Sequence, residues 1–208
     1  HHGPSGIASL LGRLSWWRAN PRWYAFLLIG VPLVFYLGAL AKGTSDADFF
    51  PLASVSAIAP ALFLAAIKGP VEELGWRGFA LPLLQRKLVP AAASLALGVV
   101  WGLWHLPAFL LSGTQQSNWD FLPFFAGTIA ISVIMTALYN DSKGSILLVA
   151  FMHFQLMNPV WPDAQPFDTW ILGALAALLL IARRSMFFTR LHAERDILNT
   201  NTALRADD

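Results

Sequence analysis

Five titratable side chains lie in otherwise apolar sequence and could do chemistry. They are the acidic pair Glu72 and Glu73, the nearby Arg77, and two histidines, His105 and His153. A carboxylate and two imidazoles can hydrolyse an amide bond either by deprotonating a water molecule or by holding a divalent metal that acidifies its bound water. Both residue types suit zinc, so the sequence leaves the two mechanisms open and does not itself require a cofactor.

The spacing of the charged residues divides their roles. Within a helix, Glu73 and Arg77 are four residues apart and share one face, with the acid on the N-terminal side that pairs best. Glu72 lies about 100° around the helix from Glu73. We therefore predict that Arg77 neutralises Glu73 and leaves Glu72 free to act on another group. The alternative is an ion-pair network that only holds two helices together.

The composition points to the membrane. Of the 208 residues, 56% are hydrophobic and 12% are charged, whereas soluble domains have about 45–50% and about 25%. The chain contains no cysteine, which excludes disulfides and Cys-ligated metal sites. The net charge is only +2, and the basic residues do not form one stripe, so no nucleic-acid partner is expected.

Stretches without charge recur along the chain at the length of about 20 residues that a membrane helix needs. We predict an all-α fold, a polytopic membrane helix bundle with about seven membrane-embedded helices in a single domain, 10–184. A helix over 10–23 that mixes Arg with Trp is expected at the membrane interface. The expected spans lie near 24–41, 50–68, 70–87, 90–111, 121–140, 144–158 and 168–184. Residues 1–9 are interpreted as a tag or disordered start, and 185–208 as a solvated polar tail.

Whether the titratable residues meet depends on how 70–87 lies in the membrane. If this helix crosses, helix directions alternate, and its start lies at the same face as the ends of 90–111 and 144–158. Glu72, His105 and His153 would then share one depth. If the helix dips in and returns, both histidines move to the opposite leaflet and no site forms.

Three short motifs resemble those of one family of intramembrane proteases, the CPBP family of CAAX prenyl proteases and bacteriocin-processing (Abi) proteins. Residues 72–79, EELGWRGF, resemble the family's EExxxR motif. Residues 101–105, WGLWH, resemble its FxxxH motif with Trp in place of Phe. Residues 140–145 followed by His153 resemble its last block. The resemblance runs in the family's order from about residue 13 to about residue 180.

The resemblance implies a role for each candidate residue. Glu72 would be the catalytic base, with Glu73 and Arg77 as its supporting pair. His105 would help to activate the water, and His153, together with Asn158, would stabilise the oxyanion. A metal requirement does not follow from the resemblance, so a divalent ion such as zinc remains an open alternative.

One position departs from the family pattern, which has Asn four residues after the last His. That position is Met157 here, and Asn158 comes one residue later, about 100° around an ideal helix. Asn158 precedes Pro159, where α conformation is disfavoured. A helix end or a one-residue bulge at this point would bring Asn158 back to the site.

The sequence thus predicts an integral, multi-pass membrane endopeptidase, expected in a bacterial-type cell membrane. Its partners would be the lipid bilayer and a peptide or protein substrate, with or without a lipid anchor. A catalytically silent relative that serves as a membrane scaffold or partner-binding subunit is the alternative, motivated by Met157. A proton-coupled transporter is a third reading, disfavoured because the sequence lacks a repeated pair of broken helices.

Overall fold

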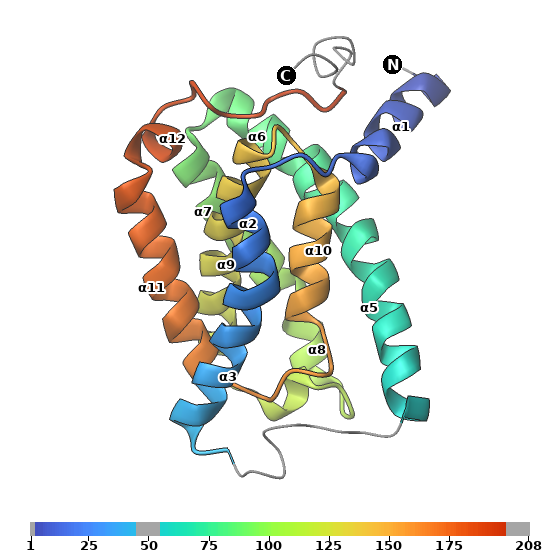
Figure 1. Ribbon diagram of the computed structural model, residues 1–208, viewed down its shortest axis with the longest axis vertical. Coiled ribbons are helices and arrows are strands. Elements are labelled where there is room, and N and C mark those ends of the chain that lie inside the picture. The colour runs from blue at the N-terminus through green and yellow to red at the C-terminus, as the bar shows by residue number, and fades with distance from the viewer. Residues whose placement is uncertain (1–2, 45–54, 199–208) are drawn as a thin grey trace.

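The computed structural model describes residues 3–44 and 55–198, and every regular element in this part of the chain is a helix (Figure 1). The α-helices are α1 (Gly3–Gly12), α2 (Pro21–Ala25), α3 (Val31–Lys42), α5 (Val55–Gly75), α6 (Leu81–Lys87), α7 (Pro90–Trp104), α8 (Leu106–Leu110), α9 (Phe121–Asp141), α10 (Ile146–Leu156), α11 (Phe167–Ala182) and α12 (Arg184–Phe188). Single π turns, η2 (Phe26–Gly30) and η3 (Trp76–Ala80), join α2 to α3 and α5 to α6 without interrupting the helix. Short 3-10 turns are η1 (Arg13–Ser15) and η4 (Gln116–Asn118).

Helix α9 lies at the centre of the bundle, where it packs against α7, α11 and α10. Helix α10 also packs against α5, and α11 packs against α3. Figure 1 shows α1, α6 and α12 at one end of the bundle and α8 at the other. Consecutive long helices therefore run in alternating directions, as expected for a bundle with short connections.

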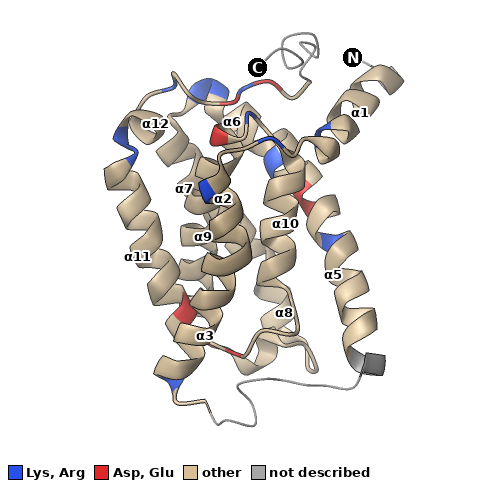
Figure 2. Ribbon diagram, viewed as in Figure 1, with Lys and Arg blue, Asp and Glu red and all other residues tan. Residues whose placement is uncertain are grey.

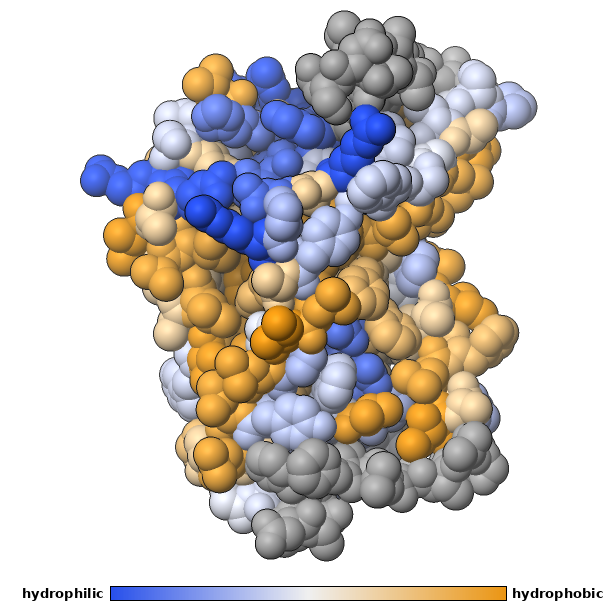
Figure 3. Space-filling view, in the orientation of Figure 1, coloured by the Kyte–Doolittle hydropathy of each residue, from blue (hydrophilic) through white to orange (hydrophobic). Residues whose placement is uncertain are grey.

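Three helical segments are long and apolar enough to cross a membrane, namely Pro21–Lys42, Pro90–Leu110 and Phe121–Asp141. Two shorter apolar helices, Ile146–Leu156 and Phe167–Ala182, accompany them. Large apolar side chains cover the outside of the bundle, among them Leu28, Ile29, Phe63, Leu64, Leu178 and Ile181. Lys and Arg gather instead at the end that holds α6 and α12 (Figures 2 and 3). The predicted all-α fold is confirmed, and this distribution is that of a multi-pass membrane protein.

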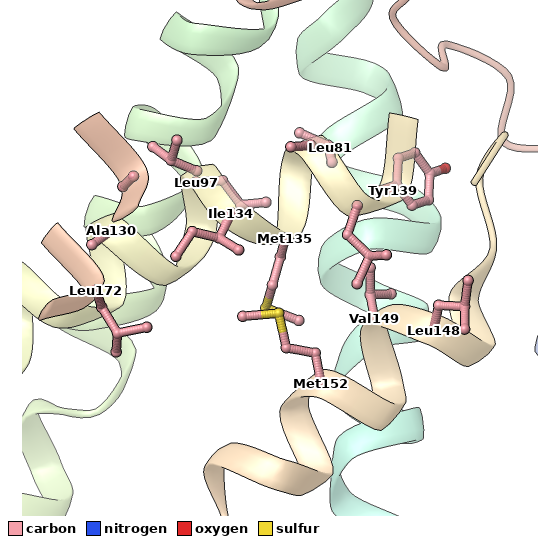
Figure 4. Close-up of a cluster of buried hydrophobic side chains, with 14 of the residues drawn as sticks. Leu81, Leu97, Ala130, Ile134, Met135, Tyr139, Leu148, Val149, Met152 and Leu172 are labelled. Carbon is pink, nitrogen blue, oxygen red and sulfur yellow. The ribbon is translucent and has the colours of Figure 1, made fainter. Parts of the chain in front are cut away.

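The core is built around the face that α9 turns toward α10 and α6. Ile134, Met135 and Leu138 on α9 are fully buried, as are Leu81 on α6 and Met152 on α10. Figure 4 shows Met135 and Met152 pointing toward one another between these helices. This packing determines the position of α10 along its own axis relative to α9 and α6.

Small residues allow α7 to approach α9 closely. A Cβ atom added to Gly98 would lie 2.8 Å from the Cα of Ile129, and one added to Gly102 would lie 2.6 Å from the Oγ1 of Thr128. Both distances are shorter than carbon and oxygen atoms tolerate, so these positions require glycine. Close approach through a GxxxG pair is a common way for membrane helices to pack.

The structure differs from the prediction in the region of the acidic residues. The expected separate spans near 50–68 and 70–87 form one uninterrupted helix over 55–87, and residues 50–54 lie outside the described part of the chain. Pro70, where the expected span 70–87 begins, lies inside α5, as does Pro60. Proline is tolerated within membrane helices because neighbouring groups satisfy the freed backbone carbonyl. Glu72 therefore lies in the middle of a long helix and not at its start.

The structure also corrects the expectations for the start of the chain. Residues 3–9, interpreted as part of a disordered start, belong to helix α1. The interfacial helix expected over 10–23 is interrupted, because residues 16–20 have no helical structure. Just before this break, the side chain of Arg13 is buried, and its Nε donates to the carbonyl of Gly144, at 2.8 Å.

Residues 185–198 of the predicted solvated tail contact the bundle at several points, although most of the side chains beyond α12 are exposed, and residues 199–208 lie outside the described part of the chain. Met186 and Phe187 of α12 are buried. Beyond α12, the carbonyl of Glu194 accepts from Gln85 Nε2 at 2.7 Å, and the amide of Glu194 donates to Asn140 Oδ1 at 3.0 Å. Apolar anchors in α12 and main-chain hydrogen bonds beyond it hold the tail across one end of the bundle. A local scan of hydrophobicity detects neither.

Candidate active site

Glu73 and Arg77 form the ion pair expected from their spacing. Arg77 Nη1 donates to both oxygens of Glu73, at 2.9 Å to Oε1 and 3.1 Å to Oε2. Neither side chain has any exposed surface. The Arg77 guanidinium also lies over the ring of Trp101, 4.7 Å from its centroid, which adds a cation–π contact. The charge of Glu73 is therefore compensated within the protein.

His153 completes this buried cluster from α10. Its Nδ1 lies 2.7 Å from Glu73 Oε1. A carboxylate already paired with Arg77 can only accept, so Nδ1 must carry the hydrogen and donate. Its other nitrogen, Nε2, then lies on the side of Glu72, 3.9 Å from Oε2. Glu73 thereby fixes both the orientation and the tautomer of His153.

Glu72 differs from Glu73 in its exposure and in its hydrogen bonding. Its side chain keeps 19% of its surface exposed and lines a cavity, whereas Glu73 is fully enclosed. Glu72 Oε2 has no hydrogen-bond partner in the protein. The 3.9 Å separation from His153 Nε2 is too long for a direct hydrogen bond. One water molecule between the two atoms would satisfy both.

His105 reaches the same cavity from the break between α7 and α8. Its Nδ1 lies 2.8 Å from the carbonyl of Trp101, which only accepts, so Nδ1 donates and Nε2 carries the lone pair. The ring is held edge-on between Trp101 and Phe124, with centroid distances of 5.7 Å and 5.2 Å. Pro107 follows two residues later and prevents α7 from continuing straight.

The cavity has a volume of about 680 Å³ and is bounded by six helices, α3, α5, α7, α9, α10 and α11, and by the segments at the α8 end. Figure 3 shows hydrophilic side chains recessed among apolar ones in this half of the molecule. The wall is largely aromatic and aliphatic. Polar side chains that line it include Lys68, Glu72, His105, Thr128, His153, Gln165, Asp168 and Thr169. A pocket of this size and character accommodates a short peptide segment.

Comparison with known proteins agrees with this arrangement. Residues 53–158 match the family described as type II CAAX prenyl endopeptidase Rce1-like. The chain belongs to this family. It is also similar to CAAX prenyl protease 2 of Methanococcus maripaludis, with 32% identity over 143 residues that cover 64% of this chain and 53% of the relative. The chain thus spans about half the length of the curated relative it matches, and the resemblance inferred from the EELGWRGF segment is confirmed.

Asn158 does not reach the site, although the family pattern suggested that it would. Helix α10 ends at Leu156, and Asn158 lies in the following turn. There its Oδ1 accepts from the amide of Val160 at 3.1 Å, and its Nδ2 donates to Gln155 Oε1 at 3.4 Å. Met157 lines the cavity at the position where the family has Asn. The helix end before Pro159 therefore turns Asn158 away from the cavity.

The sequence analysis missed a polar group on the opposite wall of the cavity. Gln165, Asp168 and Thr169 line the cavity at the start of α11. Gln165 Nε2 donates to Asp168 Oδ2 at 3.3 Å and to Thr169 Oγ1 at 3.4 Å, and Gln165 Oε1 is buried without a partner. The signal was present, since Asp168 is an acidic residue at the edge of an apolar stretch.

The donor atoms do not form a ready metal site. Within residues 3–44 and 55–198, no group of three or more His, Cys, Asp and Glu side chains converges as a metal ion would require. Glu73 and the Nδ1 atom of His153 are occupied with each other and with Arg77. As placed, the side chains therefore do not converge as the ligands of a tetrahedral zinc site do.

Proposed function

We propose that this protein is an intramembrane endopeptidase that hydrolyses a peptide bond with a water molecule activated by Glu72. The observation that supports the proposal is the division of labour between two adjacent glutamates. Glu73 is saturated by Arg77 and His153. Glu72 lines the cavity, and its buried Oε2 has no partner within the described part of the chain and lies 3.9 Å from His153 Nε2. A carboxylate kept unpaired beside an imidazole suits general-base work.

In the proposed reaction, His153 carries a proton on both ring nitrogens, and its Nε2–H donates to a water molecule that in turn donates to Glu72 Oε2. Glu72 takes a proton from this water as its oxygen attacks the carbonyl carbon of the scissile bond. His105 Nε2, whose lone pair is free because Nδ1 donates to Trp101, accepts a second hydrogen bond from the water and orients it. Protonated Glu72 then gives its proton to the departing amine as the C–N bond breaks.

His153 is the residue that we assign to the oxyanion. Its Nδ1 donates to the Glu73 carboxylate, and in the doubly protonated ring the Nε2–H can donate to the negatively charged oxygen of the tetrahedral intermediate. This assignment needs no contribution from Asn158, which lies outside the cavity.

The substrate we propose is a peptide or protein segment near the membrane surface. The similar archaeal protein is called a CAAX prenyl protease, which supports a substrate that carries a prenyl or other lipid group near its C-terminus. The aromatic and aliphatic wall of the cavity supports an apolar group beside the scissile bond. A substrate without a lipid group would use the same catalytic residues.

The test is a Glu72→Gln variant of the whole protein, purified in detergent and incubated with a panel of lipidated and unmodified peptides. We expect a 10²- to 10⁴-fold loss of cleavage, about the contribution of a general base, with unchanged helical content and unfolding temperature. Asp141→Asn is the matched control. It removes a carboxylate that does not line the cavity and that pairs with Arg183. If Glu72→Gln cleaves at the wild-type rate, the proposal is wrong.

A second candidate is a family member without activity that acts as a scaffold or partner-binding subunit. Met157 at the family's Asn position and the exclusion of Asn158 from the cavity favour it. This candidate predicts that wild-type protein and Glu72→Gln behave alike with every peptide of the panel, and that both capture the same membrane partner.

A further inference from the structure

A second cavity lies apart from the candidate active site, between α2, α9 and α11. Its volume is about 270 Å³. Its lining residues come from 20–26, from α9 and from 175–183, and none of them lines the cavity of Glu72. Helix α11 packs against α9 and α3, and this second cavity lies beside α2, nearer the end that holds α6 and α12 (Figure 1). We call it the α2–α11 groove.

Both walls of the groove carry an arginine next to apolar side chains, in the same order. On one wall, Arg22 and Phe26 are four residues apart and share one face of their helix. On the other, Leu175, Leu179 and Arg183 follow one another at the same spacing, over about 12 Å of helix. The two helices run in opposite directions, with α2 starting and α11 ending near α12 (Figure 1). Both arginines therefore lie at the same end of the groove.

The two arginines differ in their partners. Asp141 Oδ1 accepts from Arg183 Nη2 at 2.7 Å, and its Oδ2 accepts from Trp23 Nε1 at 3.1 Å. This carboxylate joins α2 to α11 and holds Arg183, which still keeps 47% of its side chain exposed. The guanidinium of Arg22 is exposed and has no hydrogen bond or ion pair within the described part of the chain. With two arginines and one aspartate, the groove keeps a net positive charge.

This order of charge and apolar surface matches that of an anionic phospholipid. Figure 3 shows hydrophilic surface around α2 and hydrophobic surface over the part of α11 farther from α12, which places the arginines at the level of lipid headgroups. Basic pockets between membrane helices bind anionic headgroups. We propose that the α2–α11 groove binds one anionic phospholipid. Its phosphate would lie between Arg22 and Arg183, and an acyl chain would extend along Phe26, Leu175 and Leu179.

The charge of the groove determines which lipid it prefers. A phosphatidylglycerol headgroup carries one negative charge, which complements the excess of one arginine, whereas the ammonium group of phosphatidylcholine cancels its phosphate. A lipid bound here would connect α2 and α11 beside Asp141, so its binding should stabilise the folded protein. The inference goes beyond the proposed peptidase function and does not depend on it, because the groove shares no residue with the cavity of Glu72.

The test measures the unfolding temperature of the whole protein in detergent during titration with phosphatidylglycerol or with phosphatidylcholine of the same acyl chains. A ligand that binds only the folded state raises this temperature with its concentration, which gives an apparent Kd. We expect the Kd for phosphatidylglycerol to be lower by at least about 5-fold. Arg22→Gln and Arg183→Gln should each raise it about 5-fold, the contribution of one basic residue near an anionic lipid. Without lipid, both variants should unfold near the wild-type temperature, because both side chains are exposed.

Arg184→Gln is the matched control. Arg184 is the exposed neighbour of Arg183 and does not line the groove, so this variant should keep the wild-type Kd. Glycerol phosphate, which has the phosphate without acyl chains, should not raise the unfolding temperature at concentrations at which phosphatidylglycerol saturates. If the two lipids bind equally, or if Arg184→Gln weakens binding as much as Arg22→Gln, the proposal is refuted in favour of general attraction to a basic surface. If glycerol phosphate stabilises as strongly as the lipid, the groove binds a free phosphate and the lipid assignment is wrong.

Discussion

Replacing Arg77 with methionine removes one partner of a fully enclosed ion pair. Arg77 Nη1 contacts both Glu73 oxygens, at 2.9 Å and 3.1 Å, and neither side chain is exposed. Breaking a buried pair in this way costs about 3–5 kcal/mol, because the remaining charge is left without compensation. His153 Nδ1 still donates to Glu73 Oε1 at 2.7 Å. We therefore expect a loss near the lower limit, about 3 kcal/mol in the free energy of unfolding.

The reciprocal change separates this cause from a loss of packing. Glu73→Gln alone leaves the Arg77 charge uncompensated and should destabilise by a similar amount. The double variant, Glu73→Gln with Arg77→Met, buries no charge at this position, and methionine can still pack on the Trp101 ring. Its loss should be smaller than the sum of the two single losses by about 2 kcal/mol or more, within the range found for directly interacting residues.

The assay is reversible unfolding in mixed micelles of mild and denaturing detergent, followed by circular dichroism. Arg183→Met is the control, since Arg183 pairs with Asp141 at 2.7 Å but keeps 47% of its side chain exposed. An exposed pair contributes about 0–1 kcal/mol. If Arg77→Met is as mild as this control, or if the two single losses simply add in the double variant, Arg77 does not neutralise Glu73. Glu72 and Glu73 would then not differ in the way that the proposed function requires.

Two further predictions concern the scaffold. Gly98→Ala should lower the free energy of unfolding by about 1–3 kcal/mol, because the new Cβ would lie 2.8 Å from a backbone atom of α9. Gly173→Ala, which meets nothing within 4 Å, should raise it by about 0.5–1 kcal/mol, and equal stability of the two variants would contradict the close approach of α7 and α9. Asn140→Ala should cost about 1–3 kcal/mol with peptide cleavage unchanged, since Asn140 exchanges hydrogen bonds with Gln85 at 2.8 Å and 3.1 Å at the end of the bundle away from the cavity. A slower cleavage rate in a stable Asn140→Ala protein would show that the two ends are coupled.

The pairing within one helix could be read from the sequence, because it depends on local geometry alone. Four residues separate Glu73 from Arg77 in any α-helix, so their contact required only that the segment be helical. The approach of His153 was also predicted, but from a different topology. The prediction started a new helix at Pro70, whereas α5 runs through it. His153 meets Glu73 because the last turns of α10, which ends at Leu156, pack beside Gly69 in the middle of the helix over 55–87.

Contacts between distant segments explain what the sequence could not reveal. Arg13 was assigned to the membrane interface because Arg and Trp alternate around it, yet its side chain is buried. It donates to the carbonyl of Gly144 and to the hydroxyl of Tyr139, and also to the carbonyls of Asp196 and Ile197. These partners are more than 120 residues away. No local pattern marks an arginine whose partners exist only after the bundle has formed.

The position of Asn158 outside the cavity affects which side chains can donate to the oxyanion in the proposed reaction. An enzyme with Asn one turn after the last His could share the oxyanion between an amide and an imidazole. Here Met157 occupies that position in the cavity, and Asn158 is engaged with the amide of Val160. In the proposed reaction the oxyanion is therefore left to His153, whose Nδ1 lies 2.7 Å from Glu73 Oε1. Glu73 would then act on the substrate through His153, so that the buried ion pair and the proposed chemistry would depend on the same carboxylate.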